Sequence, residues 1–182
     1  ITAVKQIIMV EGYMDVISLY SAGFRNVVAS MGTSLTQEQA RLLKRYVDTV
    51  YISYDGDSAG QNANLKGMDI LKDEGLNVRV VPLPEGLDPD DVIKQQGAEG
   101  YQKCLDSAMP LIDYKLKVVM SKYDVSDTVD KRTCIAEALA VVKTADTETE
   151  KEELLKQLRA QTGVSLEALK RDLSAKRIEK PT

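Results

Sequence analysis

The stretch VYISYDGDSAG, residues 50–60, joins an apolar run to two aspartates, Asp55 and Asp57, that flank one glycine. An apolar run that turns polar so abruptly is typical of a buried strand ending at the surface. Asp-Gly favours a hairpin turn, but a long helical pattern follows and the next apolar run starts about twenty residues later. The stretch therefore predicts a strand, an acidic loop and a helix in succession.

The same order repeats through the first hundred residues. Four apolar runs are predicted as strands: QIIMV (6–10), NVVAS (26–30), VYISY (50–54) and NVRVVPL (77–83). Helical patterns alternate with them over residues 14–22, 37–46 and 58–74. Thr36 and Gln39 form a capping-box pair at the start of the second helix. This alternation predicts right-handed crossovers and an α/β fold with a mostly parallel four-stranded sheet flanked by helices.

The chain changes character near residue 108. Beyond it no strand is predicted, and helical patterns run over residues 110–122, 128–143, 148–162 and 165–178. We expect two domains, an α/β domain over 1–108 and an all-helical subdomain over 109–182. The basic tail at 170–180 is interpreted as a solvated helix end, with contact to DNA as the alternative.

Composition narrows the chemistry. The chain has 182 residues, a net charge of −4, no histidine and two cysteines that form no paired motif. Histidine-based triads and most zinc sites are therefore excluded, which leaves carboxylates and metal ions. No apolar run approaches the roughly 18 residues of a membrane span. The cysteine usage fits a reducing compartment, so we expect a cytoplasmic protein with no membrane partner.

Six acidic residues follow the predicted strands: Glu11, Asp15, Asp55, Asp57, Asp88 and Asp90. Parallel strands end at one edge of a sheet, where sites form in open α/β sheets. Carboxylates gathered there repel one another unless a cation compensates them. We therefore predict a divalent-metal site for two ions that handles phosphate esters.

Each of these features also has a plain structural explanation. Asp57 can cap a helix, and Asp88 with Pro89 resembles a helix cap followed by a first-turn proline. Two other acidic motifs were compared. An EF-hand starting at Asp55 fails, because Ala59 and Lys66 stand where ligands are needed. A haloacid-dehalogenase-type phosphohydrolase, in which Thr or Val is usual at the position of Ala59, is disfavoured.

A further loop after the second strand contains Gly32, Thr33 and Ser34. Backbone N–H groups and hydroxyls at the entrance of a helix suit a phosphate. We predict nucleotide or phosphate binding at these three residues.

Four segments together resemble the bacterial DnaG-type DNA primase, whose catalytic part contains a Toprim domain: VEGYMDVISLYSAG (10–23), VVASMGTSLT (27–36), YISYDGDSAGQNA (51–63) and LPEGLDPDDVI (83–93). The resemblance covers residues 5–120 most strongly. The helical remainder would be the helical subdomain of that family's RNA-polymerase core. The zinc-binding domain, the basic N-terminal lobe and the helicase-binding domain of the family would lie outside this chain.

The resemblance implies DNA-templated synthesis of RNA primers for DNA replication by nucleotidyl transfer from NTPs. Glu11, Asp55 and Asp57 would be the catalytic carboxylates, and Asp15, Asp88 and Asp90 would complete the metal site. The cofactor would be Mg²⁺ or Mn²⁺, with zinc confined to the missing domain. Partners would be a single-stranded DNA template, NTPs, the RNA primer and, through the absent domain, the replicative helicase at the bacterial replication fork. The isolated chain would be weakly active or inactive.

Two alternatives remain open from the sequence. The same metal site could belong to a Toprim-family nuclease or phosphohydrolase, which would cleave rather than extend nucleic acid. The acidic edge could also be vestigial in a non-catalytic module that binds nucleic acid.

Overall fold

A computed structural model describes residues 5–31, 34–55 and 61–175, with the side chains of 61–63 excepted. The chain divides into two compact units, Ile1–Leu111 and Ile112–Thr182, and each is described by itself. From the sequence we expected the boundary at residue 108. The strand pair that ends the first unit accounts for the later division.

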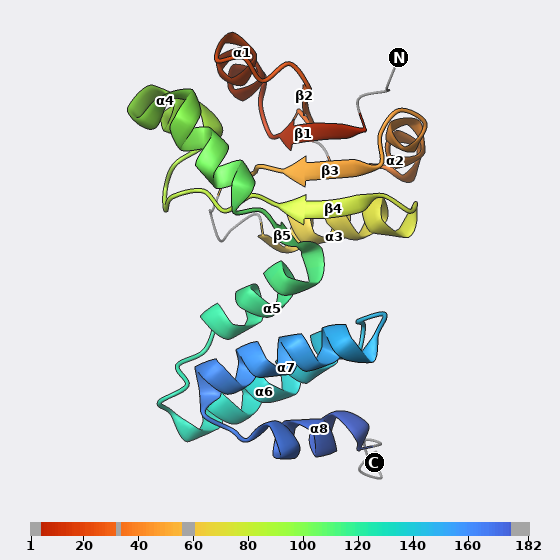
Figure 1. The fold of residues 1–182 in the computed structure, drawn as a ribbon, viewed down its shortest axis with the longest axis vertical. Helices are drawn as coiled ribbons and strands as arrows, with labels where there is room; N and C mark the ends of the chain where they lie inside the picture. Colours follow the sequence, from red (N-terminus) through yellow and green to blue (C-terminus); the bar gives the residue numbers. More distant parts are fainter. Residues whose placement is uncertain (1–4, 32–33, 56–60, 176–182) are drawn as a thin grey trace. The chain divides into compact units, whose positions relative to one another are not determined.

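The first unit is a five-stranded sheet with helices on both faces (Figure 1). Its elements in chain order are β1 (Gln6–Val10), α1 (Tyr13–Ser21), β2 (Val27–Ala29), α2 (Gln37–Lys44), β3 (Thr49–Ile52), α3 (Gln61–Asp73), β4 (Asn77–Val80), α4 (Pro89–Asp106) and β5 (Met109–Pro110). The strand order is β2-β1-β3-β4-β5. The predicted α/β fold with a mostly parallel sheet is confirmed.

The first four strands are parallel, and their registers align their carboxyl ends. Met9 of β1 lies opposite Val28 of β2 and Ile52 of β3, and Ile52 in turn lies opposite Val80 of β4. The fifth strand, β5, was not predicted and pairs antiparallel with β4. It is only two residues long and ends in proline, so no alternating pattern marks it in the sequence.

One face of the sheet packs on α1 and α4. Its buried cluster contains Ile8 and Val10 of β1, Leu19 of α1, and Val92 and Tyr101 of α4. Because side chains alternate along a strand, the other buried β1 residues point to the opposite face, where α2 and α3 pack together. Burial on both faces explains the continuous apolar runs in the sequence.

Helix α4 combines a strong start with an internal break. Asp88 and Asp91 form a reciprocal capping box, and Pro89 occupies the first turn. The break is at Gly97, whose φ of 72° and ψ of −173° are not helical. Only glycine adopts that conformation readily, so Gly97 allows the two halves of α4 to take different directions.

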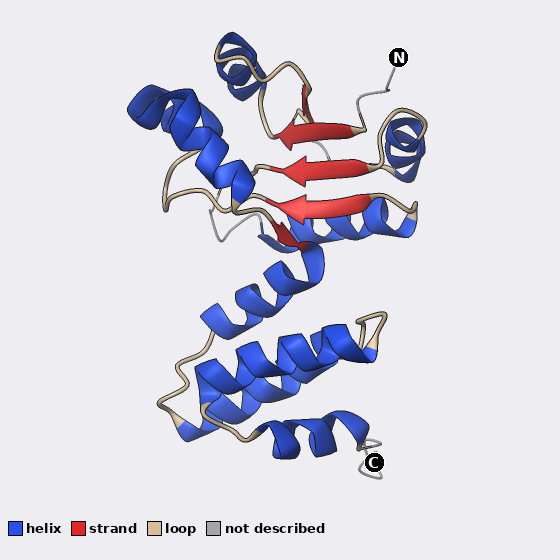
Figure 2. Ribbon diagram, viewed as in Figure 1, coloured by secondary structure: helices blue, strands red, loops and turns tan. Residues whose placement is uncertain are grey.

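The second unit contains only helices among its described residues (Figure 2). They are α5 (Leu111–Ser121), α6 (Thr128–Val142), α7 (Glu148–Thr162) and α8 (Leu166–Ser174). Their buried faces form one aliphatic cluster that includes Leu116, Leu139, Leu158 and Leu169. Side chains of Asp127, Thr147 and Ser165 cap α6, α7 and α8.

Candidate metal centre at the carboxyl edge of the sheet

The carboxyl ends of β1, β3 and β4 lie side by side at one edge of the sheet, where their arrowheads point the same way (Figure 1). Glu11 follows β1 directly, Asp55 lies three residues beyond β3, and Asp88 begins α4 after β4. Helices α1 and α4 also pack together. The acidic segments are distant in the sequence, and the order of the strands places them at one edge of the sheet.

Glu11 and Asp55 are joined directly. The amide nitrogen of Asp55 donates a hydrogen bond to Oε1 of Glu11 at 3.2 Å. The amide of Met31, beyond β2, donates to the carbonyl oxygen of Glu11 at 3.0 Å. Met31 has a φ of 57°, the left-handed conformation that is uncommon outside glycine. The loops after three strands thus meet around Glu11.

Asp15 is the most buried of the described acids at this edge, with a relative exposure of 7% against 9% for Asp90. Its Oδ1 accepts a hydrogen bond from the amide nitrogen of Asp90 at 3.2 Å, which connects α1 to the start of α4. Burial raises the pKa of Asp15, and the negative charges of Asp88 and Asp55 add to that rise. Asp15 therefore lies within electrostatic reach of both other acidic segments.

Asp90 already has compensation from the protein. Its carboxylate accepts hydrogen bonds from the Ser18 hydroxyl and from Nζ of Lys94, the latter at 2.6 Å. The bond from Lys94, followed by that from Ser18, holds the pKa of Asp90 below its usual range. From the sequence we expected a metal ion alone to offset the repulsion between these acids, whereas Lys94, one helical turn after Asp90, supplies part of the compensating charge.

Asp91 was not among the candidate metal ligands that we predicted from the sequence. One carboxylate oxygen each from Asp88, Asp90 and Asp91 lies within 4.8 Å of the others, close enough to share a metal ion. Asp88 and Asp91 also bond each other's amides, at 2.7 and 3.2 Å. The acidic pair three residues apart, which marks a capping box in the sequence, could have identified Asp91.

Three predicted residues, Asp57, Gly32 and Thr33, lie outside the described residues. Ser34 is described and exposed ahead of Thr36, the N-cap of α2. Its phosphate role stays a prediction. The acids that the described structure does bring together are Glu11 with Asp55, and Asp15 with the Asp88–Asp91 segment. Carboxylate oxygens of this kind are ligands that Mg²⁺ and Mn²⁺ accept.

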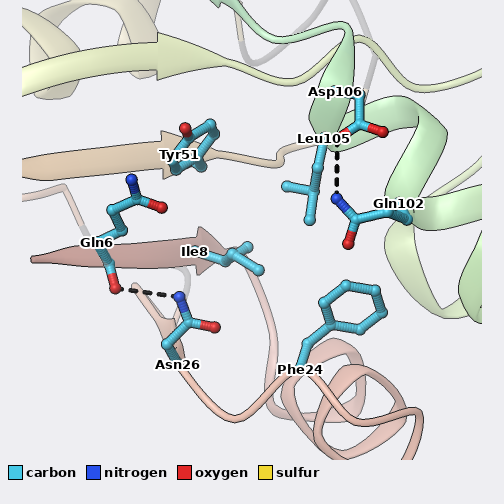
Figure 3. A pocket seen from close by; sticks show the side chains of 8 residues that line it. All are labelled: Gln6, Ile8, Phe24, Asn26, Tyr51, Gln102, Leu105 and Asp106. Carbon is cyan, nitrogen blue, oxygen red and sulfur yellow. Dashed lines mark hydrogen bonds between the residues drawn. The ribbon is translucent and has the colours of Figure 1, made fainter. Parts of the chain in front are cut away.

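The first unit also has a separate pocket of about 330 Å³ (Figure 3). Ile8, Phe24, Tyr51 and Leu105 give it apolar walls, and polar residues surround them: Gln6, Asn26, Gln102 and Asp106. None of the predicted site residues lines it. In the described ranges, no helix has both the length and the apolar character required to cross a membrane.

The α/β fold and its acidic edge are typical of one class of proteins. Residues 8–93 match that class, the Toprim-like family. The resemblance to DnaG-type DNA primase is confirmed by proteins of that name. The DNA primase of Clostridium acetobutylicum is 39% identical over 163 residues, which are 90% of this chain and 27% of that protein. This chain spans about a quarter of the length of such relatives.

Solved structures agree. A DNA primase domain from Pseudomonas aeruginosa superposes with a TM-score of 0.65 at 29% identity, covering 95% of this chain and 55% of that one. A DnaG primase catalytic domain bound to ssDNA superposes with a TM-score of 0.66 at 30% identity, covering 90% of this chain and 53% of the other.

A second family match concerns the helical unit. Residues 112–167 match the DnaB-helicase binding domain of primase. We had expected helicase binding only through a domain outside this chain, so this match differs from that expectation. The solved primase domains also extend over nearly the whole chain, helical unit included.

Proposed function

We propose that this chain is the metal-binding part of the catalytic core of a DNA primase, which synthesises RNA primers on a DNA template. Residues 1–108 would be the Toprim catalytic domain and residues 109–182 the helical subdomain of the core. The observation that carries the proposal is the meeting of Glu11, Asp55, Asp15 and the Asp88–Asp91 segment at one edge of the sheet.

In this proposal Glu11, Asp55 and Asp57 are the catalytic carboxylates. Asp15, Asp88 and Asp90 complete the ligand set, and Asp91 joins them. Bound Mg²⁺ or Mn²⁺ would activate the attacking 3′-hydroxyl and neutralise charge on the phosphates. The protein contributes fixed geometry: Glu11 is held by the amide of Asp55, and Asp15 is held by the amide of Asp90. Gly32, Thr33 and Ser34 would hold a phosphate of the incoming nucleotide.

The substrates follow from the same proposal. They are NTPs, a single-stranded DNA template and the growing RNA primer. One solved relative is described as bound to ssDNA, which supports the template. Residues 1–108 contain 10 Lys and Arg against 15 Asp and Glu. A segment with this excess of negative charge does not hold a polyanion through its own charge, so most cations for the template would lie in the longer protein. We therefore expect the isolated chain to bind metal but to synthesise primers poorly.

Metal binding is tested on the isolated chain by titrating Mn²⁺ and measuring free ion by electron paramagnetic resonance. Glu11→Gln and Asp55→Asn should each weaken binding at least about tenfold, since even outer-shell changes often cost that much. Asp106→Asn, at the far end of α4 and bonded to Gln102, is the matched control and should bind normally. Absence of Mn²⁺ binding by the unaltered chain would overturn the proposal.

Extension is distinguished from cleavage in the full-length primase that carries this sequence. With NTPs and single-stranded DNA, the protein should form short RNA, and Glu11→Gln should abolish it. Degradation of the DNA without RNA synthesis would instead establish the Toprim-type nuclease. A chain that binds DNA but no metal would establish the non-catalytic module.

A second function, binding of the replicative helicase, is favoured by the family match over residues 112–167. Calorimetric titration of the full chain into a replicative helicase tests this separately from metal binding. Heat of binding that persists in Glu11→Gln would assign the contact to surfaces other than the acidic edge.

A further inference from the structure

Tyr101 is the largest fully buried side chain of the first unit, at 0% exposure. It lies in the second half of α4, beyond the break at Gly97. Its hydroxyl donates a hydrogen bond to Oγ of Ser53 at 2.9 Å, and Ser53 is also fully buried. This bond joins α4 to the first residue beyond β3.

Ser53 lies where β3 pairs with β1, just before the acidic loop that follows β3. The amide of Ser53 donates to the carbonyl oxygen of Met9 at 2.9 Å, which extends the pairing of β3 with β1. Asp55 lies two residues after Ser53 in the chain, and Glu11 lies two residues after Met9. Tyr101 therefore bonds the residue at the base of the Asp55 loop, and the amide of that residue is in turn bonded to β1 two residues before Glu11, while Asp90 lies at the start of the helix that carries Tyr101.

The phenol ring has little freedom to turn away. Phe24 packs edge-on against it, with ring centroids 5.0 Å apart and an interplanar angle of 79°. Burial raises the pKa of Tyr101 above that of a free phenol, and the nearby charge of Asp15 acts in the same direction. The hydroxyl accordingly stays protonated and available as a donor at neutral pH.

We infer that Tyr101 is a positioning residue, whose hydrogen bond to Ser53 fixes the spacing between the acidic start of α4 and the acidic loop after β3. The start of α4 is held to α1 by Asp15 and Ser18. The Tyr101–Ser53 bond adds a second attachment, to the sheet itself. The consequence for metal affinity rests on the proposed function, whereas the consequence for geometry does not.

The test compares Tyr101→Phe with Phe24→Leu. The first removes the hydroxyl and keeps the ring, and the second removes ring packing and keeps the hydroxyl. Tyr101→Phe should weaken Mn²⁺ binding and speed hydrogen exchange at the Asp55 and Asp90 amides, each by roughly three- to tenfold, the range of one hydrogen bond. Phe24→Leu should lower the melting temperature and leave Mn²⁺ affinity unchanged.

Ser53→Ala should reproduce the effect of Tyr101→Phe, and the double variant should be no worse than either single one, because both remove the same bond. The inference is overturned if Tyr101→Phe matches the unaltered chain in both exchange and affinity, or if Phe24→Leu weakens Mn²⁺ binding equally. Exchange is measured by NMR without metal. A chain that fails to bind Mn²⁺ would thus refute the proposed function while exchange still decides the role of Tyr101.

Discussion

Asp15 is an acid kept where a carboxylate is least favoured. It is buried, it faces the charges of Asp88 and Asp55, and its pKa is raised chiefly because of burial. Its compensation in the described structure comes from backbone N–H groups, including that of Asp90. A side chain that costs stability at this position is consistent with a functional role, since sites that bind charged ligands often sacrifice stability.

Asp15→Asn should therefore stabilise the metal-free chain at neutral pH, by about 1 kcal/mol, because the amide oxygen can still accept from Asp90 and no charge is buried. The folded carboxyl has the higher pKa, so the stability of the unaltered chain falls as pH rises from 3.8 through that raised pKa. The difference between the two proteins should shrink as pH falls. Urea unfolding in EDTA at several pH values measures this.

Asp90→Asn serves as the control with the opposite sign. Lys94 and Ser18 lower the pKa of Asp90, so its contribution to stability is present above its unfolded pKa and is lost as pH falls through the lower folded value. Asp90→Asn should destabilise at neutral pH and have little effect in strong acid. Equal behaviour of both variants would contradict the environments assigned to these two aspartates.

At the scale of elements, α4 is the part whose geometry depends most on one residue. Gly97 has a backbone conformation that other residues rarely adopt. Gly97→Ala should either strain the break, at a cost of roughly 1–3 kcal/mol, or straighten the helix. Straightening would separate Tyr101 from Ser53. We expect lower stability together with weaker Mn²⁺ binding, measured by thermal unfolding and resonance titration.

Gly163→Ala is the matched control for that prediction. Gly163 ends α7 in the left-handed conformation, with a φ of 73°, and nothing lies within 4 Å of an added Cβ. Its replacement should cost about 1 kcal/mol and leave Mn²⁺ binding as it was. An unchanged Mn²⁺ affinity in Gly97→Ala would show that the break in α4 is a feature of packing alone.

Most of the strands, but not all of them, could be predicted from the sequence. The apolar runs located β1 to β4 to within a few residues because both faces of the sheet are buried, and this fixed which acids share an edge. The predicted capping box is confirmed, because the side chains of Thr36 and Gln39 each accept a hydrogen bond from the other residue's amide. β5 could not be predicted, because two residues contain no period, and its pairing depends on where β4 lies.

The contacts that hold the acids of the site in place could not be predicted from the sequence. Lys94 lies four residues after Asp90, and this spacing is so common on helices that it does not by itself indicate a role for the lysine in the site. The Tyr101–Ser53 bond joins residues 48 positions apart, and no local pattern predicts it. Sequence reasoning thus located the acids along the chain, but the contacts that hold them depend on tertiary packing.

At the scale of the whole molecule, the two units differ in what a metal can do for them. Every acid of the candidate site lies between residues 11 and 91, within the first unit. The second unit has its own aliphatic cluster across α5 to α8, which includes Leu116, Leu154 and Leu169. A ligand stabilises only the cooperative unit whose folded state binds it.

Calorimetric unfolding should therefore show two transitions, of which Mn²⁺ raises only one. At a free Mn²⁺ concentration one hundred times the Kd, the first unit should gain about 2.7 kcal/mol while the second keeps its midpoint. Glu11→Gln should abolish the shift, and Leu158→Ala, in the buried cluster of α7, should lower the other transition alone. One transition that moves as a whole with Mn²⁺ would mean that the units unfold as a single body, and Leu158→Ala would then lower the transition that Mn²⁺ raises.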